Sequence, residues 1–251
     1  MARCYLGLNQ SDSAKFYITK SLNLDDKQPA TFYFLGAVLN KENNYAKALE
    51  AYQQAITLDP RMYEAYNAMG RIYKFQGKYE KAIMAFENSL KIFEFQPQIV
   101  EDIADCLLQS NKFVAAIAQY RIALGMGYQS PNLLFNLGNT YFLNDEVSNA
   151  EKSYQLALEM DSTSAEIYYN LGNCYVKRGN FDVAIGAYKK AINLNKAQPD
   201  YFNNLAMSYR YSNNLKEALR VFDQGLRLHK DSPLLRQNEA ETRKLYDERI
   251  K

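Results

Sequence analysis

One pattern of residues recurs every 34 residues along almost the whole chain. Numbering each copy from 1 to 34 places alike residues at alike positions, with six complete copies beginning at Pro29, Tyr63, Pro97, Pro131, Ala165 and Pro199. Position 20 is alanine in every copy: Ala14, Ala48, Ala82, Ala116, Ala150, Ala184 and Ala218. Position 24 is bulky and apolar or aromatic: Ile18, Tyr52, Phe86, Tyr120, Tyr154, Tyr188 and Phe222. A fixed period of this length is typical of a repeat array, in which each unit buries its apolar faces on its neighbours.

Each copy is predicted to form two helices. Apolar or small residues at positions 4, 7, 8 and 11 have helical spacing, and positions 20, 21, 24, 27 and 28 give a second helical face. Position 15, between them, holds only asparagine, aspartate or glycine, the residues that best tolerate a left-handed backbone at a helix end. These residues are Asn9, Asn43, Gly77, Asn111, Asp145, Gly179 and Asn213. Proline occupies position 1 at Pro29, Pro97, Pro131, Pro199 and Pro233, where its fixed φ suits the first turn of a helix.

This register divides the chain into eight segments. We expect a partial repeat over residues 1–28, complete repeats over 29–62, 63–96, 97–130, 131–164, 165–198 and 199–232, and a C-terminal capping helix over 233–251. The repeat at 97–130 is the most divergent. Because Met1 falls at position 7, we expect the chain to be a fragment, or another segment to cover its N-terminal face; a naturally short first helix is the alternative. The last helix is diluted by charge, as the exposed end of a solenoid requires.

The pattern resembles the tetratricopeptide repeat (TPR) family over nearly the whole chain. The resemblance implies an all-α fold, a right-handed α-solenoid of stacked antiparallel helix pairs. In this family the first helices line a concave groove and the second helices form the convex side. Departures from the family pattern are the absence of tryptophan and the residues Val100 and Leu134 at position 4.

Asparagine recurs at groove positions of the last three complete repeats. Position 6 holds Asn136, Asn170 and Asn204, position 9 adds Asn139 and Asn173, and position 5 adds Asn203. An amide side chain carries both a donor and an acceptor, so a row of amides can pair with the backbone of an extended peptide without reading its sequence. The arrangement is similar to the asparagine ladder in the repeat domains of O-GlcNAc transferase and kinesin light chains. The alternative is that these asparagines only cap or solvate the helix face.

Other side chains are expected around this row of amides. Apolar peptide contacts are predicted from Phe135, Phe142, Tyr169 and Tyr211, with Lys177 and Arg210 as charged rims. Glu101, Asp102 and Asp105 are predicted to form an acidic groove patch that favours a partner segment carrying lysine or arginine, although such a cluster is more often a solvated face.

The residues that carry chemistry do not assemble into a motif. Cys4, Cys106 and Cys174 all occupy position 10 of different repeats, so we interpret them as core residues, with no disulfide framework, no metal site and a reducing, cytoplasmic location. His229 is the only histidine, and the net charge is +2, which gives no reason to expect nucleic acid or an anionic membrane. We predict no enzyme activity, no cofactor, no membrane insertion and no small-molecule substrate.

The sequence therefore predicts a non-catalytic adaptor or scaffold that binds an extended segment of a partner protein. One alternative is a structural subunit of a large assembly that docks through its convex face or its ends. Another is the substrate-recruiting arm of a larger enzyme. A clamp for a C-terminal carboxylate is disfavoured, because it needs basic residues at positions where this chain has Asn67, Asp102 and Asn132, or Phe135, Asn170 and Asp200.

Overall fold

A computed structural model describes residues 11–24 and 27–250 of the chain. Helices make up its regular structure, and no strand occurs among those residues. The chain divides into two compact units, Met1–Tyr128 and Gln129–Lys251, and each is described by itself. The sequence-based interpretation of residues 1–10, which include Cys4 and Asn9, lies outside the described residues.

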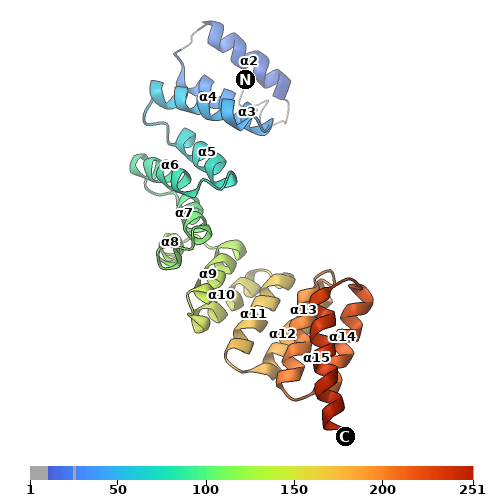
Figure 1. Ribbon diagram of the computed structural model, residues 1–251. Helices are drawn as coiled ribbons and strands as arrows, with labels where there is room; N and C mark the ends of the chain where they lie inside the picture. Colours follow the sequence, from blue (N-terminus) through green and yellow to red (C-terminus); the bar gives the residue numbers. More distant parts are fainter. Residues whose placement is uncertain (1–10, 25–26, 251) are drawn as a thin grey trace. The chain divides into compact units, whose positions relative to one another are not determined.

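Among its described residues, the first unit contains one helix followed by three helix pairs (Figure 1). Helix α2 (Ser11–Leu24) packs against the first helix of the following pair. The pairs are α3 (Pro29–Lys41) with α4 (Tyr45–Leu58), α5 (Tyr63–Phe75) with α6 (Tyr79–Ile92), and α7 (Pro97–Gln109) with α8 (Phe113–Gly125).

The second unit contains three further pairs and a long last helix. The pairs are α9 (Pro131–Leu143) with α10 (Val147–Met160), α11 (Ala165–Lys177) with α12 (Phe181–Leu194), and α13 (Pro199–Tyr211) with α14 (Leu215–Leu228). Helix α15 (Pro233–Arg249) packs on both α13 and α14 (Figure 1). The prediction of an all-α solenoid of stacked helix pairs is confirmed by these packing partners.

The turn inside each pair is set by the residue at position 15. Among the described residues, every one of these has a positive φ, from 57° at Asn111 to 75° at Gly179. In the turn after α11, the amide N–H of Gly179 donates to Val176 and that of Asn180 donates to Tyr175, at 2.9 and 2.8 Å. This pair of bonds is the Schellman arrangement, which satisfies the last carbonyls of the first helix and reverses the chain.

The core of each pair is an aromatic ring of the second helix that lies on the backbone of the first. Tyr188 is 1 % exposed, and a Cβ atom added to Gly172 would come within 2.5 Å of its ring. The same relation joins Gly36 to Tyr52, Gly70 to Phe86 and Gly138 to Tyr154. In these four pairs, glycine at position 8 lets the ring approach the backbone of the first helix more closely than a Cβ atom would allow.

Helix α15 follows the register of the first helices. Counting on from Pro233, its two buried residues Leu235 and Thr242 fall at positions 3 and 10, which Leu133 and Thr140 occupy on α9. Most of the remaining residues of α15 are exposed, and the helix is strongly polar in composition. The helix thus covers the apolar side of α13 and α14 while it presents charged side chains to water.

Candidate functional site

Position 9 of the first two repeats in the second unit carries an amide that links three helices. The Oδ1 atom of Asn139 on α9 accepts a hydrogen bond from the hydroxyl of Tyr154 on α10 at 2.7 Å. The same oxygen accepts from Nδ2 of Asn170 on α11 at 2.9 Å. One amide oxygen therefore ties a first helix to its own second helix and to the next first helix.

The same arrangement returns one repeat later. Oδ1 of Asn173 accepts from the Tyr188 hydroxyl at 2.7 Å and from Nδ2 of Asn204 at 3.0 Å. Nδ2 of Asn204 also donates to the hydroxyl of Tyr169 at 3.0 Å. Burial raises the pKa of both Tyr154 and Tyr188, so each stays a protonated donor near neutral pH. We call the residues Asn139, Asn170, Asn173 and Asn204 the amide ladder.

The ladder changes form at its C-terminal end. Position 9 of the sixth complete repeat is Met207, which offers no amide oxygen. Asn203 takes over this part: it donates to Oδ1 of Asn204 at 3.1 Å and accepts from Nδ2 of Asn238 on α15 at 2.6 Å. Asn203 is only 7 % exposed and its amide is bonded within the protein, and its contact with a peptide stays a prediction.

The internal bonds leave one polar group available on Asn139, Asn170 and Asn173, whereas both groups of Asn204 are bonded internally. Asn139 and Asn173 use Oδ1 internally, and Asn170 uses Nδ2. The one buried side-chain nitrogen or oxygen without a partner, among the described residues, is Oδ1 of Asn67 in the first unit. The second amide group of each ladder residue is therefore either paired or in reach of water. Asn136, half-buried on α9, has its backbone carbonyl bound by the Thr140 hydroxyl at 2.6 Å.

A pocket of about 530 Å³ opens beside the C-terminal half of the ladder. Six residues predicted from the sequence as peptide contacts line it: Phe142, Asn173, Lys177, Asn203, Asn204 and Tyr211. The other lining residues, Val176, Tyr188, Met207, Ser208 and Asn238, were not predicted as peptide contacts. Asn238 could have been found by carrying the register past Pro233, because it then falls at position 6 like Asn170 and Asn204.

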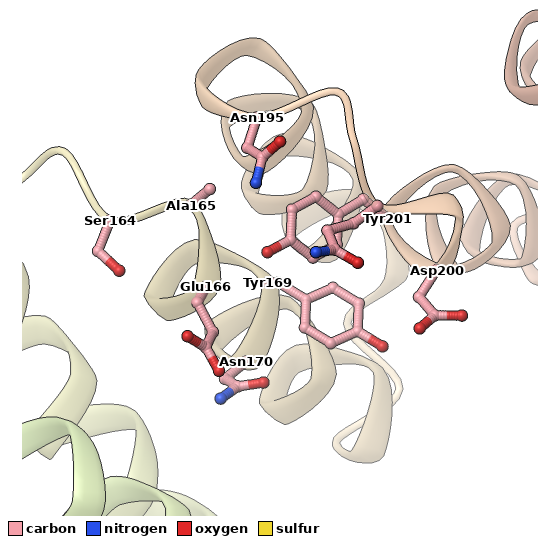
Figure 2. A pocket seen from close by; sticks show the side chains of 9 residues that line it. Ser164, Ala165, Glu166, Tyr169, Asn170, Asn195, Asp200 and Tyr201 are labelled. Atoms are coloured by element: carbon pink, nitrogen blue, oxygen red, sulfur yellow. The ribbon is translucent and has the colours of Figure 1, made fainter. Parts of the chain in front are cut away.

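A second pocket, of about 470 Å³, lies at the start of α11 and α13 (Figure 2). It contains two more of the predicted residues, Tyr169 and Asn170, together with Glu166, Asp200 and Tyr201. The sequence analysis did not predict this pocket as a site.

The remaining predicted contacts of the second unit are engaged with neighbouring side chains. The Phe135 ring packs on Tyr154 with 6.1 Å between centroids. Lys177 forms an ion pair with Asp145 at 2.5 Å and stands over the Phe142 ring. Arg210 reaches Glu241 on α15 at 3.4 Å, and Tyr211 packs on Phe181 while staying 56 % exposed.

The predicted acidic patch of the first unit is neutralised from within. Nζ of Lys74 on α5 lies 2.7 Å from Asp102 and 2.6 Å from Asp105 on α7, and Arg71 lies 3.4 Å from Asp102. Burial alone would lower the pKa of Lys74, but the two carboxylates outweigh it and raise that pKa. Asp105 also accepts from the Tyr120 hydroxyl at 2.6 Å. Two of the three predicted acids are thus already paired.

Glu101, the third residue of this patch, is half-buried, and burial raises the pKa of its carboxyl. Asp102 and Asp105 act on Glu101 in the same direction. Asp102 and Asp105 thus belong to a charge cluster between α5 and α7, and the binding of a basic partner segment by this acidic groove patch stays a prediction.

The cysteines and the histidine occupy structural positions. Cys106 and Cys174 are buried and unpaired, as expected of core residues, and Cys4 lies outside the described residues. Nε2 of His229 lies 2.9 Å from the carbonyl of Lys196, and its ring packs on Phe202. Within residues 11–24 and 27–250, no three metal-ligating side chains of the His, Cys, Asp or Glu types gather in one place. No helix in that part of the chain is long and apolar enough to span a membrane.

Several solved structures share this fold at low sequence identity. The C-terminal part of a TPR repeat-containing protein from Cytophaga hutchinsonii has a TM-score of 0.80 at 15 % identity, covering 94 % of this chain and 97 % of that one. A chain of the Cut9-Hcn1 hetero-tetramer of the APC/C has a TM-score of 0.64 at 16 % identity; the match covers 96 % of this chain but only 48 % of that one. The MamA protein has a TM-score of 0.64 at 23 % identity, over 67 % of this chain and 92 % of that one.

Sequence comparison points to the same class. No curated protein sequence matches this chain. The tetratricopeptide repeat family matches residues 1–28, 29–62, 51–84, 129–197 and 163–231. These segments cover most of the chain and agree with the helix pairs, the glycine–ring contacts and the positive-φ turns described above. The chain belongs to the tetratricopeptide repeat family.

Proposed function

We propose that this protein is a non-catalytic scaffold whose second unit binds an extended segment of a partner protein along α9, α11 and α13. The observation that carries the proposal is the amide ladder. Asn139, Asn170 and Asn173 are fixed by internal hydrogen bonds that leave the other polar group of each for a ligand, whereas Asn204 uses both of its polar groups internally. An amide held in one orientation loses little side-chain entropy when a peptide binds.

The chemistry of the ladder suits a peptide backbone. Asn139 and Asn173 use their oxygen internally, which leaves the N–H donors of Nδ2 for carbonyl groups of the ligand. Asn170 uses one donor internally, which leaves its carbonyl oxygen for an N–H of the ligand. A bound segment would thus meet donors and acceptors on successive helices, and this pattern reads backbone rather than side chains.

The pocket beside Asn173 supplies an apolar anchor. Val176, Met207, Tyr211 and Phe142 give it an apolar lining next to the amides. Methionine adapts to side chains of different shape, which suits a groove that accepts more than one sequence. An apolar side chain of the bound segment would fill this pocket while the neighbouring backbone pairs with the ladder.

The test removes the free donors without disturbing the internal bonds. Asn139→Asp and Asn173→Asp keep the oxygen that binds tyrosine and the next asparagine, but replace the outward NH2 group by a carboxylate oxygen. The chain itself shows that aspartate fits here, because Asp105 occupies position 9 and accepts from Tyr120 at 2.6 Å. The probe is a 12-residue peptide selected by phage display on the whole protein and synthesised with a fluorophore.

We expect the double variant to fold like the wild type and to bind the peptide about 5- to 150-fold more weakly, since two hydrogen bonds of roughly 0.5–1.5 kcal/mol each are lost. The matched control is Asn193→Asp with Gln224→Glu, two exposed residues on second helices that change the net charge equally. Unchanged affinity in Asn139→Asp/Asn173→Asp, or equal losses in both double variants, would refute the ladder as the binding site.

A further inference from the structure

The pocket at the start of α11 and α13 has a different chemistry from the ladder. Tyr169 and Tyr201 stack at its centre, with ring centroids 4.8 Å apart and planes inclined by 31°. Tyr201 is 6 % exposed and supports Tyr169 from behind, and Tyr169 is only partly buried. The two rings form an aromatic wall within a pocket of about 470 Å³.

Two carboxylates flank this aromatic wall. In Figure 2, Glu166 and Asn170 lie on one side of the Tyr169 ring and Asp200 lies on the other. Glu166 and Asp200 are exposed, and neither forms an ion pair within the described part of the chain. Burial raises the pKa of Tyr201, and Glu166, Tyr169 and Asp200 raise it further by their charge.

The hydrogen-bonding groups left in the pocket favour a donor as ligand. Asn170 directs its NH2 group to Asn139, so the carbonyl oxygen is the group that remains. Carboxylates accept hydrogen bonds and do not donate them. The pocket therefore combines two negative charges, an amide oxygen and aromatic rings, which together fit a flat cation with several N–H donors.

We propose that this pocket binds a cationic side chain, arginine foremost, of a partner segment. Arginine fits because its planar guanidinium packs on aromatic rings and offers N–H donors in several directions to carboxylates on both sides. The pocket shares Asn170 with the amide ladder, so a basic residue bound here belongs to the same segment as the backbone on the ladder. In that respect the proposal rests on the proposed function and adds a requirement for charge.

The same acids have a second role that the test must separate. Glu166 and Asp200 lie in the first turns of α11 and α13, where a negative charge stabilises the helix N-terminus. That role needs no ligand. A probe that differs only in charge distinguishes binding from helix stabilisation.

The experiment titrates the whole protein with Nα-acetyl-arginine amide and follows backbone amide signals by NMR at constant ionic strength. Nα-acetyl-citrulline amide, which has nearly the same shape without the charge, is the comparison ligand. We expect saturable shifts confined to the start of α11 and α13 with the arginine probe, and at least about tenfold weaker binding of the citrulline probe, because the ion pairs and the cation–π attraction are lost.

Variants tie the signal to the pocket. Glu166→Gln with Asp200→Asn is expected to abolish the shifts, whereas Glu159→Gln with Asp247→Asn, two exposed acids outside the pocket, is expected to keep them. The proposal is overturned if the arginine probe causes no localised shift, if citrulline binds equally well, or if Glu166→Gln/Asp200→Asn binds like the wild type.

This outcome is separable from that of the ladder test. Asn139→Asp/Asn173→Asp leaves the cationic pocket intact, so it is expected to bind the arginine probe like the wild type. If the arginine probe binds but selected peptides bind Asn139→Asp/Asn173→Asp as tightly as the wild type, the ladder proposal is refuted and the pocket proposal stands. If peptides depend on the ladder but the probe does not bind, the pocket alone fails.

Discussion

Replacing Gly172 by alanine tests the closest contact in the fold. Alanine normally stabilises a helix interior by about 1 kcal/mol relative to glycine, so propensity alone predicts a gain. Here the new methyl group would lie 2.5, 2.8 and 2.8 Å from three ring carbons of Tyr188. That ring is 1 % exposed and its hydroxyl is bound to Asn173, so a shift of the ring would disturb this hydrogen bond.

The structure therefore predicts a net loss of stability. Overpacking of this kind costs roughly 1–3 kcal/mol, and contact with three ring atoms argues for the upper half of that range. After the gain in propensity, we expect Gly172→Ala to lower the free energy of unfolding by about 1–2 kcal/mol. The variant should still fold, because Ala104 and Ala206 occupy position 8 in two other repeats beside Tyr120 and Phe222.

The matched control is Gly186→Ala in the adjoining helix α12. Gly186 is exposed, and a Cβ atom there would meet nothing within 4 Å, so this variant should gain about 1 kcal/mol. Urea unfolding followed by far-ultraviolet circular dichroism measures both, and hydrogen exchange in α11 and α12 shows whether the loss is local, as expected in a repeat array. If Gly172→Ala is as stable as Gly186→Ala, the assigned ring contact is wrong.

Three further predictions concern the turns, the ladder and the thiols. Gly179→Ala should lower the free energy of unfolding by roughly 1–2 kcal/mol, because φ is +75°, whereas Gly179→Asn should cost clearly less; urea midpoints of the two variants decide this. Tyr188→Phe should lower the free energy of unfolding by about 0.5–1.5 kcal/mol, because the hydrogen bond to Asn173 is lost. Tyr52→Phe should leave the free energy of unfolding nearly unchanged, since position 9 of that repeat is Ala37. Equal losses in the two variants would contradict the assigned bond. Burial raises the pKa of Cys106 and of Cys174 to about 12, so the folded state favours the thiol form. The free energy of unfolding should therefore fall as the pH rises from about 9 towards 12, where the cysteines of the unfolded chain ionise. Thermal melts of Cys106→Ser/Cys174→Ser should show a shallower fall with pH, and an equally steep fall would count against this prediction.

Much of the backbone could be predicted from residue types with narrow conformational preferences. Proline at position 1 begins α3, α7, α9, α13 and α15, and the residue at position 15 has a positive φ in every described turn. These preferences are local, so sequence alone reports them reliably. The buried alanine and aromatic positions also follow, because a fixed period brings the same faces together in each pair.

The use of the polar side chains could not be predicted in the same way. An asparagine in a groove suits an internal bond as well as a ligand, and only the geometry shows that Asn173 binds Tyr188 and Asn204. The ion pairs of the acidic patch could not be predicted for a related reason. Asp102 and Asp105 lie on one helix, whereas their partner Lys74 comes from the preceding repeat. Spacings of 31 residues join Asn139 to Asn170, Asn173 to Asn204 and Arg71 to Asp102, so this contact rule can be applied to the sequence once it is known.

The shared amide oxygens also limit how such a chain can grow by duplication. A copied repeat that brings asparagine at position 9 satisfies its own tyrosine at once, but it meets its second donor only if its successor carries asparagine at position 6. The repeats at 131–164 and 165–198 are therefore not interchangeable with the first two complete repeats, where Ala37 and Arg71 stand at position 9. Arrays with these repeats in another order should keep their helices but lose the hydrogen bonds between successive first helices, so the order of the repeats must be preserved along with the repeats themselves.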